Sequence, residues 1–170
     1  MTMIYRIIFL VIMFSLPAAA DEPSFQDELL DKFVGTWVLR GTMAGGEVTH
    51  DIVAGWTLGH QYMKFDEVSR EIDDAGKPLY EATVFIGWDQ PSGRYVCQWL
   101  DSTGGGGLVN DAFGYAEPAG DRLAFIFGDD DGRFHTTFVY SRDSDAWEWS
   151  MDAEKDGEFS LFSRVSMTRQ

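Results

Sequence analysis

The chain has almost no cysteine and few histidines, which limits both its stabilisation and its chemistry. Cys97 is the only cysteine among 170 residues, so an internal disulfide is impossible. The three histidines, His50, His60 and His135, have no second histidine or cysteine at metal-ligand spacing, and we predict no metal site. No Gly-x-Ser-x-Gly elbow, P-loop or dinucleotide fingerprint occurs. The sequence therefore predicts no catalytic residue and offers no positive sign of an enzyme.

Basic residues are also scarce. Lysine and arginine together number 13, against 28 aspartates and glutamates, and the formal net charge is −15. A surface this acidic repels nucleic-acid phosphates and anionic membranes. We expect neither a nucleic acid nor a membrane as a partner of the mature chain.

The first 20 residues have the features of a secretory signal peptide. Arg6 precedes an apolar run over 7–16, and Pro17 with the three alanines after it provides small residues at a cleavage site. The apolar run is too short to span a bilayer comfortably, which disfavours a membrane anchor. Cleavage would remove one base and no acid, taking the net charge from −15 to −16. We expect 21–170 to be a single domain in the periplasm or outside the cell.

A short helix is predicted at the start of the mature chain. Ser24 can cap a helix over 25–32, with acids in its first turn and Lys32 in its last. Leu29, Leu30 and Phe33 would face the body of the protein. Next, Gly35 would let another backbone approach closely, and the indole of Trp37 would plug one end of a barrel.

The rest of the chain consists of short alternating runs separated by turn residues. Such regular turn signals predict an all-β antiparallel meander, and short hairpin turns favour an up-and-down barrel over a Greek-key sandwich. We count about ten strands. They are expected over 35–42, 47–56, 61–69, 79–88, 94–101, 108–117, 122–128, 133–140, 146–153 and 158–169.

Alternation along these strands predicts an aromatic interior. Tyr95 and Trp99 point one way while Arg94 and Gln98 point the other, and the later strands repeat the pattern. A barrel of this size is filled by side chains or keeps one small-ligand cavity. Large rings pack less evenly than aliphatic groups, which favours a cavity.

Five stretches resemble a bacterial family of unknown function, DUF fifteen-seventy-nine, whose members look like calycins, the lipocalin, fatty-acid-binding-protein and nitrobindin type of barrel. The stretches are 30–37 (Leu-x-x-Phe-x-Gly-x-Trp), 56–59, 76–80, 86–89 and 95–102. His60 departs from the family, which tends to have a second glycine there, and a histidine adopts positive φ less readily. The resemblance implies a calycin-like barrel that binds a small hydrophobic molecule. Nitrobindin-like relatives bind haem through a histidine near the C-terminus, but 158–170 contains none, so we predict no cofactor.

We expect a small hydrophobic or aromatic ligand inside the barrel. The predicted contacts are the inward aromatic residues and two polar groups: Tyr80, Tyr95, Trp99, Phe125, Phe138 and Trp149, with His50 and Tyr62. One alternative is an enzyme that uses an inward histidine or tyrosine with a carboxylate for proton transfer. Asp66, Glu67 and Glu81 are possible carboxylates, although the sequence pairs none of them. The third interpretation is a packed barrel with no ligand that serves a structural or protein-interaction role. A cavity would argue against this third role, and a buried carboxylate beside His50 would favour the enzyme.

Overall fold

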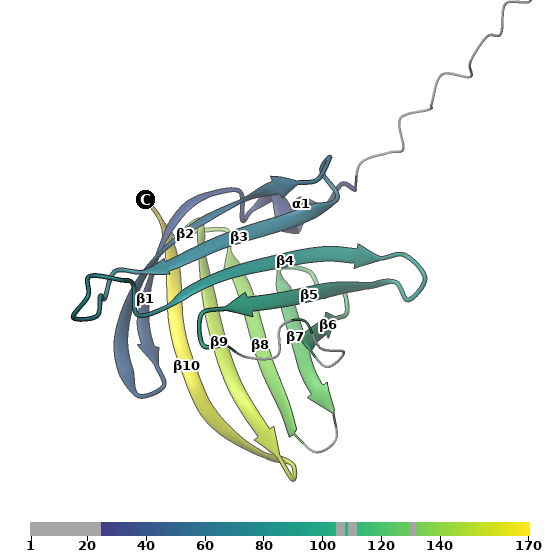
Figure 1. Cartoon of the computed structure of the whole chain (residues 1–170). Coiled ribbons are helices and arrows are strands. Elements are labelled where there is room, and N and C mark those ends of the chain that lie inside the picture. The colour runs from purple at the N-terminus through teal and green to yellow at the C-terminus, as the bar shows by residue number, and fades with distance from the viewer. Residues whose placement is uncertain (1–24, 105–107, 109–111, 130–131) are drawn as a thin grey trace, which may run out of the picture.

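Ten antiparallel strands close into one barrel in the computed structural model, which describes residues 25–104, 108, 112–129 and 132–170 (Figure 1). Each strand pairs with its neighbours in the chain, and the first pairs with the last. The predicted up-and-down barrel is therefore confirmed. The strands are β1 Gly35–Met43, β2 Gly46–Thr57, β3 Tyr62–Ser69, β4 Glu81–Asp89, β5 Arg94–Asp101, β6 Phe113–Ala116, β7 Arg122–Asp129, β8 Gly132–Ser141, β9 Ala146–Lys155 and β10 Glu158–Arg169.

The predicted N-terminal helix is reduced to a single turn, α1, over Glu28–Asp31. Asp27, rather than the predicted Ser24, caps it: its Oδ1 accepts from the backbone N–H groups of Leu29 at 2.9 Å and Leu30 at 2.8 Å. Ser24 itself lies outside the described residues. A carboxylate one residue before the turn satisfies two donors that the turn leaves open, which explains why the turn begins there.

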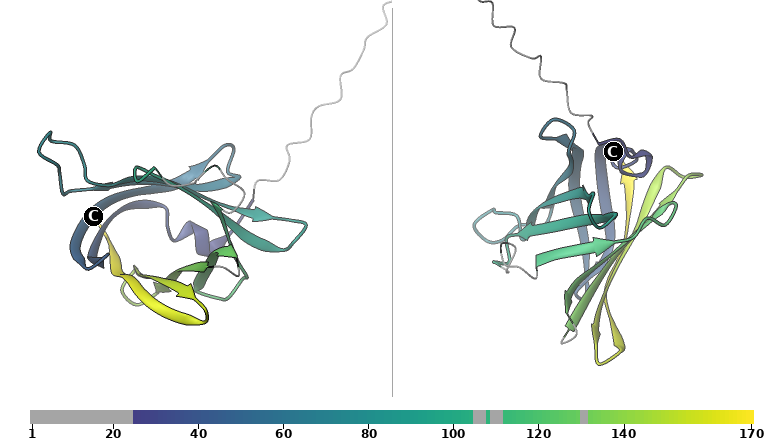
Figure 2. Two further views of the ribbon diagram at one scale, coloured as in Figure 1. Left: turned by 60° about the horizontal axis from the view of Figure 1, so that its bottom comes forward. Right: turned by 90° about the vertical axis from the view of Figure 1, so that its right-hand side faces the viewer.

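The segment after α1 plugs one end of the barrel. Seen along the barrel, α1 lies within the ring of strands (Figure 2). Phe33 is fully buried, and its ring stacks on Trp147 with centroids 3.7 Å apart. The indole N–H of Trp37 donates to the Phe33 carbonyl at 2.6 Å. Trp37 thus helps to close this end as predicted. At Gly35, however, the close neighbour is the side chain of Arg169 and not another backbone.

The seam between β1 and β10 depends on a different glycine. Gly41 has a φ of +148°, and a Cβ built on it would lie 2.3 Å from the Arg164 carbonyl oxygen. Only a residue without a side chain lets the two backbones approach this closely. On its other side, β10 shifts its pairing register with β9 between Leu161 and Ser163.

The alternation predicted from the sequence holds along most strands. Cys97, Phe125 and Trp149 are buried, and the strand residues next to them are more exposed. The sixth strand is shorter than the predicted 108–117, and part of that range lies outside the described residues. Within the described part of the chain, no helix is long and apolar enough to cross a membrane.

Candidate functional site

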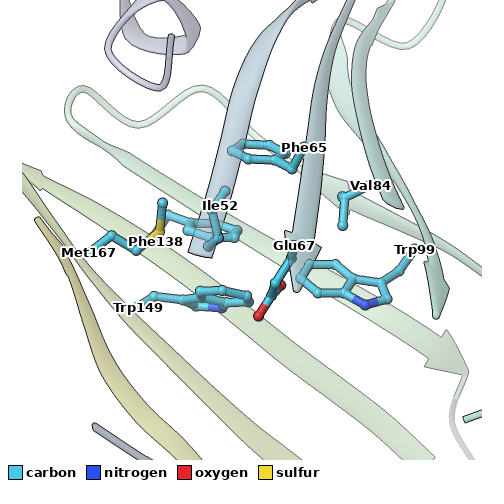
Figure 3. Close-up of a pocket in the computed structure, with 8 residues that line it drawn as sticks. All are labelled: Ile52, Phe65, Glu67, Val84, Trp99, Phe138, Trp149 and Met167. Atoms are coloured by element: carbon cyan, nitrogen blue, oxygen red, sulfur yellow. The ribbon is translucent and has the colours of Figure 1, made fainter. Parts of the chain in front are cut away.

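A small cavity lies among the inward side chains of seven strands (Figure 3). It measures about 10 Å³, counted as the space that the centre of a water molecule can reach, which is close to the room needed by one water. Seven of its eight lining residues are buried, whereas Trp99 is partly exposed. The cavity therefore approaches solvent on the Trp99 side. Its lining is Ile52, Phe65, Glu67, Val84, Trp99, Phe138, Trp149 and Met167.

Glu67 contributes a buried carboxylate to this otherwise apolar lining. Its Oε1 lies 2.5 Å from Nδ1 of His50, and both side chains are 2% exposed. The two residues come from neighbouring strands, because β2 pairs with β3 so that Ile52 faces Glu67 and His50 faces Ser69. A carboxylate at this depth is tolerated only with a hydrogen-bonding partner, and the imidazole provides one.

Tyr80 extends the polar group around His50. The two rings stack with centroids 5.5 Å apart, and the indole N–H of Trp99 donates to the Tyr80 hydroxyl at 2.9 Å. Burial raises the pKa of Tyr80 well above its usual value, and the negative charges of Glu67 and Asp101 raise it further. The phenol therefore stays protonated at neutral pH and can donate a hydrogen bond.

Aromatic rings form the wall of the cavity opposite the carboxylate. Trp99 and Trp149 lie with centroids 5.4 Å apart at 49°, and Phe138 stacks on Trp149 at 4.8 Å. Figure 3 shows the Glu67 carboxylate beside the two indoles. Trp149 Nε1 is buried and has no hydrogen-bond partner within the described residues. A donor in that state is uncommon in native proteins.

The structure brings five of the eight predicted ligand contacts together. Trp99, Phe138 and Trp149 line the cavity, while His50 and Tyr80 are joined to it through Glu67 and Trp99. Phe125 lies one ring behind the lining, edge-on to Phe138 with centroids 6.5 Å apart. The other two predicted contacts lie elsewhere.

Tyr95 and Tyr62 have structural surroundings. The Tyr95 hydroxyl donates to Oδ2 of Asp27 at 2.5 Å, and this bond ties β5 to the α1 cap at the plugged end. Tyr62 points outward, is 43% exposed and lies over Gly87, where an added Cβ would meet the tyrosine ring at 2.8 Å. An aromatic ring that covers a strand glycine is a known way to stabilise a sheet.

Sequence reasoning named Glu67 as one of several possible carboxylates but did not pair it with His50. The sequence feature that could have predicted this pairing is the short connection between β2 and β3, which fixes the register of the two strands. That register places two inward residues, His50 and Glu67, on one diagonal. The apolar lining residues Ile52, Phe65, Val84 and Met167 were not selected either, because a packed core would use the same residue types.

A second histidine–glutamate pair lies on the outer surface. His135 Nε2 lies 2.6 Å from Glu154 Oε2, but these side chains are 22% and 19% exposed. This pair borders no cavity lining and serves as a natural comparison for the buried one.

Among the described residues, no group of three or more histidine, cysteine, aspartate or glutamate side chains is placed to hold a metal ion. Comparison with models of known protein families and with curated protein sequences finds no match for this chain.

Proposed function

We propose that this chain is an exported calycin-type barrel that binds a small hydrophobic or aromatic molecule at the Trp99 side of its interior. The observation that carries the proposal is the buried Glu67 carboxylate, held by His50 at the edge of an apolar cavity. A binding site of this kind combines apolar walls with a few fixed polar groups. The calycin assignment rests on the closed antiparallel barrel, and export rests on the features of 1–20.

The size of the cavity limits how the ligand enters. Space for about one water admits a small group of the ligand, and the rest of the molecule would lie against the exposed part of Trp99. Trp99 and Trp149 would then report binding through their fluorescence. A large rigid molecule such as a sterol would need the interior to rearrange.

Filling the cavity tests the proposal. Val84 is 2% exposed and lines the cavity, whereas Val53 on the neighbouring surface is 56% exposed, so Val84→Leu and Val53→Leu add the same methylene in two places. We expect Val84→Leu to weaken binding about tenfold or more and Val53→Leu to leave it unchanged. Small amphiphiles, or a ligand found by native mass spectrometry of protein from its own organism, would serve as probes. Equal binding by both variants would reject the cavity as the site.

The same dyad supports a second candidate, an enzyme that transfers a proton. A buried carboxylate beside His50 is the arrangement expected of a general base. Exchange of α-hydrogens in small ketones for deuterium, followed by NMR, tests this candidate. Activity should be lost in Glu67→Gln and kept in Glu154→Gln. No exchange above the solvent background would leave binding as the function.

A further inference from the structure

The lining of the cavity contains an acidic side chain and no basic one, and the imidazole of His50 is hydrogen-bonded to that one carboxylate. None of its eight lining residues is a lysine or an arginine, and the single carboxylate among them is Glu67. Asp101 and Glu67 both act on the Tyr80 phenol as negative charges. The whole chain adds a net charge of −15, which attracts cations towards the barrel and repels anions.

The hydrogen bonding of Glu67 leaves it able to accept more. A carboxylate offers about four lone-pair positions, and the bond from His50 Nδ1 uses one of them. A donor inside the cavity could therefore bind the same carboxylate without breaking the pair. A positively charged donor gains most, because charge-assisted hydrogen bonds are the strongest kind.

The aromatic walls favour a cation for a second reason. Trp99 and Trp149 both line the cavity beside Glu67, and indole rings attract positive charge placed over their faces. A fatty-acid carboxylate would meet none of these attractions and would be repelled by Glu67. Arginine and lysine are the side chains that pair best with a carboxylate ligand, and this lining contains neither.

We propose that the ligand is a small organic cation, an amine whose ammonium group enters the cavity to bind Glu67 beside the two tryptophans while its apolar part lies against Trp99. This inference rests on the proposed binding function and narrows its ligand class. The ammonium group matches the water-sized space, and the apolar part matches the partly exposed indole.

Three probes of one chain length separate charge from shape. Hexylammonium, hexanol and hexanoate are titrated into the wild-type protein at neutral pH and low salt, with tryptophan fluorescence as the readout. We expect saturable binding of hexylammonium, about tenfold or more weaker binding of hexanol, and the weakest binding of hexanoate. Ammonium chloride in a fourth titration asks whether the apolar part contributes, and we expect it to bind more weakly than hexylammonium.

Matched variants locate the site. Glu67→Gln keeps the size of the side chain and removes its charge, and Glu154→Gln does the same at the outer pair. Hexylammonium affinity should fall about tenfold or more in Glu67→Gln and stay within about twofold in Glu154→Gln. Circular dichroism checks that each variant is folded. If Glu67→Gln does not fold, the comparison of the four probes on the wild-type protein still tests the proposal.

The outcomes distinguish the two proposals. Equal or tighter binding of hexanol or hexanoate, or unchanged hexylammonium affinity in Glu67→Gln, overturns the cation and leaves a binding barrel. Ammonium alone binding as tightly as hexylammonium overturns the organic class. Absence of saturable binding by every probe overturns the cation and the proposed binding function together.

Discussion

Replacing the buried His50–Glu67 pair by leucines tests whether the pair is retained for stability. His50→Leu is close in volume and leaves the Glu67 carboxylate without its partner, with both side chains only 2% exposed in the native barrel. Removing one partner of a buried carboxylate–imidazole pair typically costs about 3–5 kcal/mol, which for a domain of this size lowers the melting temperature by roughly 10 °C. Replacing both partners by apolar groups is often neutral or stabilising, because no buried charge is left.

A double-mutant cycle measures this directly. We expect His50→Leu and Glu67→Leu each to be strongly destabilising, and the double variant to be about as stable as the wild type or more stable. The same substitutions at His135 and Glu154 form the control cycle, whose coupling should stay below about 1 kcal/mol because that pair is partly solvated. Urea unfolding followed by tryptophan fluorescence gives the free energies, and equal m-values confirm that the variants are comparable. If the two inner substitutions each cost less than about 1 kcal/mol and their effects add, the reasoning about this pair is refuted.

Three further predictions concern the frame around the site. Gly41→Ala should be strongly destabilising, because a Cβ there meets the backbone of β10 at 2.3 Å. Gly55→Ala, where nothing lies within 4 Å of the added Cβ, should be neutral or stabilising by about 0.5 kcal/mol. Chemical denaturation of the two variants compares their free energies of unfolding. Asp27→Ala should lower stability by about 1–2 kcal/mol through loss of the α1 cap, measured as a thermal shift that Tyr95→Phe reproduces only in part. Burial raises the pKa of Tyr80 and of Tyr95 above 10.0, so near that pH the unfolded chain loses these phenol protons while the folded protein retains them. The urea midpoint should therefore be constant below about pH 9 and fall as the pH rises above 10. The fall should be less steep in a variant in which both tyrosines are replaced by phenylalanine.

The barrel was predictable because two local signals agreed along most of the chain. Alternation set the inner face, as in Trp147, Trp149 and Met151 on β9, and turn residues marked the strand ends. Closure of β1 on β10 followed once every strand had been paired with its chain neighbour, because a closed barrel leaves no edge.

Tyr62 was predicted as an inward ligand contact, but it lies on the outer face of the barrel. On β3 it shares its face with Lys64 and Asp66 and is opposite in alternation to Met63 and Phe65, so the period-two pattern places it outside and the prediction of an inward contact was wrong. The outward position depends on Gly87 of β4, which leaves room for the ring. A long connection joins β3 to β4, so no tight turn fixes the register that brings the two residues together.

The polar groups in the interior divide into two sets according to what they connect. At the plugged end, the bonds from Trp37 to the Phe33 carbonyl and from Tyr95 to Asp27 attach the segment around α1, which is not a strand of the sheet, to the barrel. These bonds have a clear structural task. The bond between His50 and Glu67 joins β2 and β3, which already exchange a full ladder of backbone hydrogen bonds.

A buried polar pair that adds no connection to the fold contributes little to stability, and replacing it by apolar residues removes a desolvation penalty. Proteins tolerate such penalties mainly at sites where function requires them. Under the proposed binding function, that requirement is the group that enters the cavity beside Glu67. A more stable but non-binding leucine double variant would be the direct expression of this trade-off.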